Sequence, residues 1–275
     1  MARINRVLGV ALVAGAIVAA GFAFVGAEEG VLLAYGFAEG YTNDYQVKFN
    51  NEVDFGSFAM SQIVDMDVTE KCTGKEGDLF VMELVFNKVE SVRMQFDNMV
   101  EDPTGERLTG HSVTFKVDAN GETSDMRPVD YIEGWEQMAR VIQSLVENWY
   151  AYLPNKSVKV GDGWEEVDEP KTQGDLKVTG HAAYRFKEIK DEKGCACARV
   201  EADTENTVTG SQDTPTGTMI VEGGGKGDVE FFFCPKSASI VKYKAKTEMK
   251  MDMTPEGGGD AAESTIGIMM ERHVK

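Results

Sequence analysis

Hydrophobic and polar residues alternate along residues 240–254, IVKYKAKTEMKMDMT. One set of alternate positions carries lysines and acids, and the other set is Val241, Tyr243, Ala245, Thr247, Met249, Met251 and Met253. Alternation with a period of two is typical of an antiparallel strand with one dry and one solvated face. The stretch therefore predicts a long strand whose dry face ends in three methionines.

The same alternation recurs along most of the chain. It places together Met60, Val64, Met66 and Val68, then Phe80, Met82, Leu84 and Phe86, then Val92, Met94 and Phe96, then Val113, Phe115 and Val117. Turn sequences such as Asn120-Gly121 and DEKG at 191–194 separate the later runs. Several predicted strands approach 12 to 15 residues, above the usual length of about 5 to 6, which favours a curled sheet or half-barrel.

One segment has a helical period instead. Between Val129 and Leu153, apolar residues recur at spacings of three and four, including Trp135 and Trp149. Pro128 precedes the segment, Asp130 is a candidate N-cap and Pro154 ends it. The pattern predicts a mainly β protein with one long helix, Val129 to Leu153, lying against the concave face of the sheet.

The N-terminus has the pattern of a secretory signal peptide. Arg3 and Arg6 precede an apolar run from Val7 to Val25, and small residues end it at Ala27. We predict cleavage after Ala27 and a periplasmic or extracellular protein, with residues 28–275 as one β-rich domain. An uncleaved anchor is the alternative interpretation. The domain could also comprise two β halves, 28–128 and 155–275, joined by the helix.

Charge narrows the set of partners. The chain has 28 basic and 46 acidic residues and a formal net charge of −18. Such an acidic protein is repelled by nucleic acid, so we expect no nucleic-acid partner. After signal cleavage we also expect no stable transmembrane anchor. The sequence identifies no protein partner.

Four cysteines, Cys72, Cys195, Cys197 and Cys234, are candidates for disulfides in an exported chain. The turns at 191–194 and 234–236 should emerge at the same end of the C-terminal meander. We therefore expect Cys195 or Cys197 to pair with Cys234, leaving Cys72 for the other. A metal or redox role for Cys195 and Cys197 is the minor alternative.

Signatures of catalysis are lacking. His111, His181 and His273 have no partner at motif spacing, and the glycine-rich EGGGKGD at 222–228 lacks the Ser/Thr and the helix of a phosphate loop. Paired acids such as Asp65 and Asp67 lack the spacing of a calcium loop. The sequence predicts a protein that is not an enzyme and has no cofactor.

The methionines leave three interpretations open. Thioethers suit Cu(I), but methionine also fills irregular apolar space. Met249, Met251 and Met253 continue a dry face that begins at Val241. They can belong to a filled core, line an apolar ligand site or bind a soft metal.

A resemblance supports the layout. The stretch "LPxxxVxVGDxW", carried by Leu153, Pro154, Val158, Val160, Gly161, Asp162 and Trp164, resembles a family of exported bacterial proteins classed as a domain of unknown function. It would cover residues from Tyr35 to Met253. The layout is also similar to periplasmic half-barrel carriers of lipoproteins and lipids (LolA/LppX-like), although this chain lacks a lipobox cysteine. The likeness is one of architecture only.

Together these observations predict non-catalytic binding of an apolar, lipid-like molecule between curled sheet and helix. The alternatives are a structural or interaction protein of the envelope or an extracellular assembly and, more distantly, a methionine-based copper protein. The predicted ligand-binding residues are Met60, Met66, Met82, Phe86, Met94, Phe96, Trp135, Trp149, Tyr243, Met249, Met251 and Met253.

Overall fold

The computed structural model describes residues 30–56, 59–95, 98–167, 170–173, 175–214, 217–258 and 261–275. The predicted signal peptide lies outside these residues. Two helices are described, α1 (Thr104–Leu108) and α2 (Trp135–Glu147). The strands are β1 (Val31–Leu33), β2 (Thr42–Asp54), β3 (Ala59–Glu76), β4 (Leu79–Gln95), β5 (Asn98–Glu101), β6 (Ser112–Val117), β7 (Thr123–Pro128), β8 (Lys156–Val158), β9 (Gly163–Val167), β10 (Lys171–Gln173), β11 (Leu176–Glu192), β12 (Cys195–Thr214), β13 (Gly217–Cys234), β14 (Ser239–Pro255) and β15 (Ala262–Val274).

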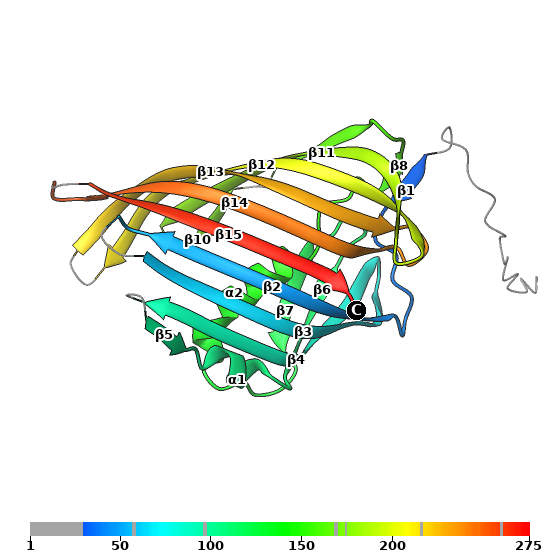
Figure 1. Cartoon of the computed structure of the whole chain (residues 1–275), viewed down its shortest axis with the longest axis horizontal. Coiled ribbons are helices and arrows are strands. Elements are labelled where there is room, and N and C mark those ends of the chain that lie inside the picture. Colours follow the sequence, from blue (N-terminus) through cyan, green and yellow to red (C-terminus); the bar gives the residue numbers. More distant parts are fainter. Residues whose placement is uncertain are drawn as a thin grey trace, which may run out of the picture.

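Thirteen of the described strands form one antiparallel sheet (Figure 1). Its order is β10-β11-β12-β13-β14-β15-β2-β3-β4-β6-β7, with β5 on β4 and β9 on β11, so the sheet is open. β1 and β8 form a separate pair. Strands on both sides of α2 in the sequence share the large sheet, because the last strand, β15, pairs with β2.

The long strands are joined by tight turns. Between β11 and β12 the two-residue loop is Lys193-Gly194, and both residues have positive φ. This is the conformation of a type I′ hairpin turn, whose twist matches that of the strands. The hairpins hold strands of up to 20 residues, longer than the sequence predicted.

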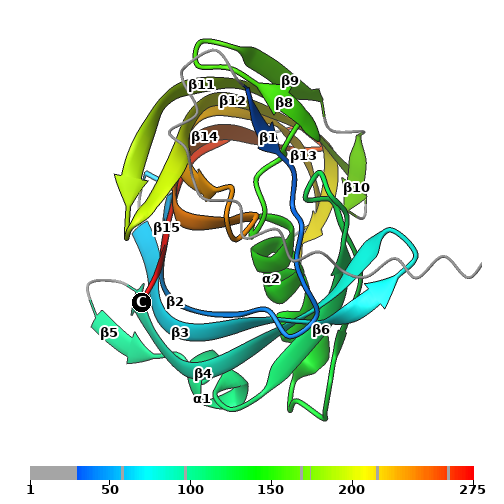
Figure 2. The same ribbon diagram turned by 90° about the vertical axis from the view of Figure 1, so that its right-hand side faces the viewer.

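The sheet curls around α2, which lies on its concave side (Figure 2). Met138, Ile142 and Val146 on α2 are buried in the core cluster shared with the sheet. The predicted long helix is corrected, since α2 has 13 residues and does not span Val129 to Leu153. It begins after Gly134, which has a left-handed conformation, and it ends before Asn148. Asp130 does not cap it and instead lies 3.0 Å from Nδ1 of His111.

Strand β14 departs from the predicted pattern at its start. A bulge between the pairs Phe232–Lys242 and Phe233–Ile240 shifts the register. Ile240 and Tyr243 are in the main core, whereas Val241 packs in a separate small cluster with Phe232 and Cys234. Val241 is therefore not on the methionine face, which begins at Tyr243.

No helix among the described residues is both long and apolar enough to cross a membrane.

Candidate functional site

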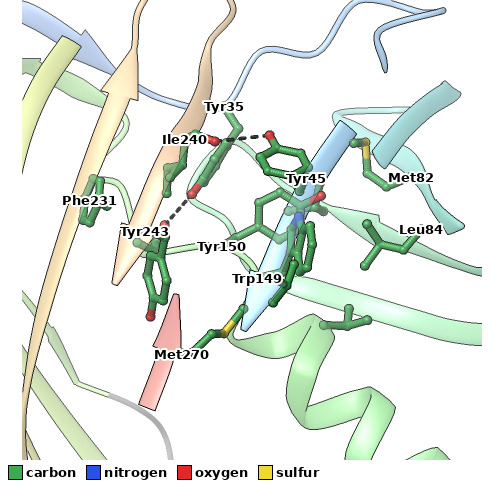
Figure 3. Packing of buried hydrophobic residues seen from close by; sticks show 14 of the residues in the cluster. Tyr35, Tyr45, Met82, Leu84, Trp149, Tyr150, Phe231, Ile240, Tyr243 and Met270 are labelled. Atoms are coloured by element: carbon green, nitrogen blue, oxygen red, sulfur yellow. Dashed lines mark hydrogen bonds between the residues drawn. The ribbon is translucent and has the colours of Figure 1, made fainter. Parts of the chain in front are cut away.

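One end of the concave face is filled. Side chains from the sheet, the N-terminal segment and the residues after α2 pack there (Figure 3). Tyr45 and Trp149 meet edge to face, with ring centroids 5.5 Å apart, and Tyr35 meets Tyr150 in the same way at 5.1 Å. The hydroxyl oxygen of Tyr45 also lies 3.2 Å from the carbonyl oxygen of Ile240 (Figure 3). This end is a solid aromatic core.

A carboxylate lies inside this core. Glu70 is 1% exposed and accepts hydrogen bonds from the indole N–H of Trp149 at 2.9 Å and the hydroxyl of Tyr150 at 2.6 Å. The hydroxyls of Tyr41 and Tyr45 each lie 3.2 Å from its other oxygen. Burial and the charge of Glu70 raise the pKa of Tyr150 well above its usual value, so the phenol stays a donor.

The positive charge of Arg272 balances the negative charge of Glu70. Arg272 is 2% exposed, and its guanidinium carbon lies 4.4 Å from the ring centroid of Trp149 and 5.0 Å from that of Tyr45. These are the two aromatic residues that also bond Glu70. Opposite charges thus flank one aromatic pair, which lowers the cost of burying each charge. The sequence analysis did not identify Glu70 or Arg272 as important. Glu70 could have been noticed, because it is an acid on the otherwise apolar face of residues 64–72.

Toward the other end of the same face the methionines are half-buried, whereas Ser264 and Val221, opposite Met251 and Met253, are buried. In an antiparallel pair, directly opposed residues share a face. The register links Met249 on β14 to Ile266 on β15, Val53 on β2 and Met60 on β3. All four are half-buried. The far ends of β13 and β14 extend beyond α2 (Figure 1), so we call this half-buried part of the concave face, with Met251 and Met253, the open apolar surface.

A stripe of glycines shapes this surface. Gly223 and Gly225 on β13 are paired with Met251 and Met249. A Cβ at Gly225 would lie 2.5 Å from Cγ of Met249, and one at Gly223 would lie 2.8 Å from Cγ of Met251. The two methionine side chains therefore lie across the glycines. The glycine-rich stretch therefore makes space for the methionines.

The structure separates the predicted ligand-binding residues into groups. Five are buried: Met66, Met82, Phe86, Trp149 and Tyr243. Half-buried are Met60, Trp135, Met249, Met251 and Met253. Phe96 lies outside the described residues. The open apolar surface therefore brings together Met60, Met249, Met251 and Met253, while the buried group belongs to the filled end.

The prediction that Met94 lines the ligand site is wrong. Between Phe86 and Val89, β4 carries a bulge, and the face that points inward changes from even to odd residue numbers. Met82, Leu84 and Phe86 are inward before the bulge, and Val89, Ser91 and Arg93 are on that face after it. Met94 therefore lies on the convex side and does not line the concave face.

Of the two predicted disulfides, the one to Cys234 is confirmed and the one to Cys72 is wrong. Cys195 and Cys234 form a disulfide, with Cα atoms 6.0 Å apart. Cys72 and Cys197 are both free and buried, so the predicted bond between them is wrong. Cys72 lies in the main core and Cys197 in the small convex-side cluster, and the sheet separates them. The sulfur atoms of Cys195, Cys197 and Cys234 all lie within 4.8 Å of one another.

Two hollows of about 490 and 470 Å³ also occur in the described structure. The first is lined by residues 39–42 and 71–73, and the second includes Glu76, Lys116 and Asp125. Neither is lined by a predicted ligand-binding residue.

Comparison with solved structures shows what the fold is similar to. A structure described as lipid–protein interactions in lipovitellin matches with a TM-score of 0.53 and 11% identity, over 87% of this chain. This chain spans only 25% of the lipovitellin chain. At this identity the match shows a similar fold alone. The observed class is a mainly β protein with a large, open antiparallel sheet.

Other similarities are too weak to support an argument. A loop-deletion mutant of OmpT, an outer membrane protein of Vibrio cholerae, matches at TM-score 0.23 and 7% identity, over 86% of this chain and 100% of that one. A protein of unknown function from the DUF3598 family of Nostoc punctiforme matches at 0.12 and 9%, over 82% and 94%. No family model matches the sequence, and no curated protein does. The expected likeness to LolA/LppX-like carriers is not among these matches, and what the comparisons show is a fold similar to part of lipovitellin.

Proposed function

We propose that this exported protein binds an apolar or amphipathic, lipid-like molecule on the open apolar surface, without catalysis. The observation that carries the proposal is the change in burial along one face. On β14, Tyr243 is buried at the filled end, whereas Met249, Met251 and Met253 farther along the same face are half-buried. A concave face with half-buried, adaptable methionines is suited to apolar ligands.

Two further observations support it. The matched structure is described by its lipid–protein interactions, and its fold is similar to that of nearly the whole chain. The disulfide is compatible with the predicted location outside the cytoplasm. The copper interpretation of the methionines gains no support, because glycines rather than further sulfur or imidazole groups lie opposite Met249 and Met251.

Binding of an environment-sensitive apolar dye tests the proposal. Wild-type protein should enhance its fluorescence, and Met251→Gln should weaken binding about fivefold, because a polar amide replaces an apolar contact. Lys250→Gln is the matched control, since Lys250 is the exposed neighbour on the convex side. Equal, weak fluorescence with all three proteins would count against a ligand site.

A structural or interaction protein with a solid core is the second candidate. The aromatic packing around Glu70 and Arg272 favours it, because that end of the concave face is filled. Sedimentation would show a concentration-dependent oligomer if this candidate is right, together with no dye binding.

A further inference from the structure

A row of polar side chains crosses the concave face between its filled end and the open apolar surface. The register runs from Thr204 through Gly227, Thr247, Ile268, Asn51 and Gln62 to Arg93, on β12, β13, β14, β15, β2, β3 and β4. We call the polar members of this row, Thr204, Thr247, Asn51, Gln62 and Arg93, the polar row. Each is directly opposed to its neighbour in the register, so all share the concave face.

Apolar rows lie on both sides of it. The next row toward the filled end includes Val229, Ala245, Met270 and Phe49. The next row outward includes Met249, Ile266, Val53 and Met60. A molecule on the open apolar surface would thus have one end against hydrogen-bonding groups and its length against apolar ones.

Neighbouring residues fix the side chains at both ends of the polar row. A Cβ at Gly227 would lie 2.6 Å from Oγ1 of Thr247 and 2.8 Å from Oγ1 of Thr204, so the glycine lets both hydroxyls converge. At the other end, Asp102 accepts hydrogen bonds from Gln62 at 2.6 Å and from Arg93 at 3.3 Å. The charge of Arg93 is therefore balanced by a carboxylate, and the row is close to neutral.

Asn51, in the middle of the polar row, has an unpaired side-chain oxygen. Its Oδ1 is shielded from solvent and has no hydrogen-bond partner among the described residues. Leaving a shielded polar atom unpaired is costly. The side chain as a whole is half-buried, so part of it is accessible from the concave face. A hydroxyl satisfies this amide in either orientation, since it both donates and accepts, whereas a carboxylate offers no donor.

From this arrangement we infer that the ligand is an uncharged amphiphile with a hydroxyl-bearing head group. The inference rests on the proposed function. The head group lies at the polar row beside Asn51, and the alkyl chain extends over Met249, Met251 and Met253. The formal net charge of −18 also disfavours an anionic head group.

Three probes with the same alkyl chain test the inference: a long-chain alkanol, its methyl ether and the corresponding alkanoate. Wild-type protein should bind the alkanol about tenfold more tightly than either of the others, because only the alkanol donates a hydrogen bond. Asn51→Leu should abolish this preference while leaving methyl ether binding unchanged.

Asn50→Leu is the matched control. Asn50 is the adjacent residue of the same type, paired with Ile63 and Met269 on the opposite face, so this variant should keep the preference. Thr247→Val removes a hydroxyl with little change of shape and should reduce the preference if Asn51→Leu fails to fold. Equal binding of the three probes, tighter binding of the alkanoate, or a preference that survives both substitutions would overturn the inference but leave the proposed function standing. If no probe binds, the proposed function fails as well.

Discussion

Glu70 shows how a single residue organises the filled end of the concave face. One oxygen accepts hydrogen bonds from Trp149 and Tyr150, which follow α2. The other lies within hydrogen-bond distance of the hydroxyls of Tyr41 and Tyr45, at the start of β2. The residues after α2 are thereby fixed to β3. Glu70 thus joins β3, the start of β2 and the segment after α2 inside the filled end.

Glu70→Ala should therefore destabilise the protein strongly. It leaves several buried donors and the charge of Arg272 without their partner, and the expected loss in the free energy of unfolding is about 3 kcal/mol. Denaturant unfolding measures it. Glu122→Ala, at an exposed position, is the control and should cost less than about 0.5 kcal/mol. Similar losses for both variants would contradict this role of Glu70.

The buried tyrosines predict loss of stability at alkaline pH. Burial raises the pKa of Tyr243 to about 12, and burial and the charge of Glu70 raise the pKa of Tyr150 well above its usual value. A folded-state pKa above the unfolded value of about 10 contributes stability that is fully present below pH 10. This stability falls as the pH rises through the folded-state pKa. Thermal unfolding midpoints measured between pH 7 and 12 should decline above pH 10. Midpoints that stay constant above pH 10 would contradict this prediction.

At the scale of elements, glycines and bulges decide what each strand presents to the concave face. The glycine stripe on β13 receives the methionines of β14, and one bulge in β4 turns Met94 outward. Such features depend on the neighbouring strand. They are therefore difficult to predict from the periodicity of a single stretch.

Gly225→Ala should cost stability because of close packing. The added Cβ would lie 2.3 Å from the carbonyl oxygen of Glu248 and 2.5 Å from Cγ of Met249. We expect a loss of about 1 to 3 kcal/mol in the free energy of unfolding. Gly267→Ala is the control, since its Cβ would meet no atom within 4 Å. Equal stability of the two variants in thermal unfolding would exclude this role for Gly225.

The three neighbouring cysteines predict an alternative disulfide. Ala198 pairs with Phe233, so Cys197 follows in register beside Cys234. In Cys195→Ala, oxidative refolding should join Cys197 to Cys234 and leave Cys72 as the one free thiol. Burial raises the pKa of the Cys197 thiol to about 11, which keeps it from exchanging with the native bond at neutral pH. Mass mapping that finds three free thiols would refute the pairing.

The sequence was informative about elements and less so about their surroundings. Alternation correctly predicted long strands, because each has one buried and one solvated face. The helix was predicted too long, because apolar residues after Glu147, such as Trp149 and Leu153, are buried by the core without continuing the helix. Arg272 and Asn51 were missed, because their importance comes from the strands opposite them, which periodicity does not identify.

For the whole molecule, one concave face has two different parts. The filled end gives the fold its aromatic core, and the open apolar surface extends beyond α2 with the polar row between them. This division reconciles the two leading sequence-based interpretations of the methionines. Met66 and Met82 belong to a filled core, whereas Met249, Met251 and Met253 are half-buried on the open apolar surface, where we propose that the ligand binds.

The most direct test of a guest site on the open apolar surface is photolabelling with a long-chain alkyl diazirine, followed by peptide mapping. We expect labels on residues 247–253 of β14 and 262–268 of β15, with competition by an excess of unlabelled alkanol. Labels confined to the convex side, or the same labelling with and without competitor, would contradict it.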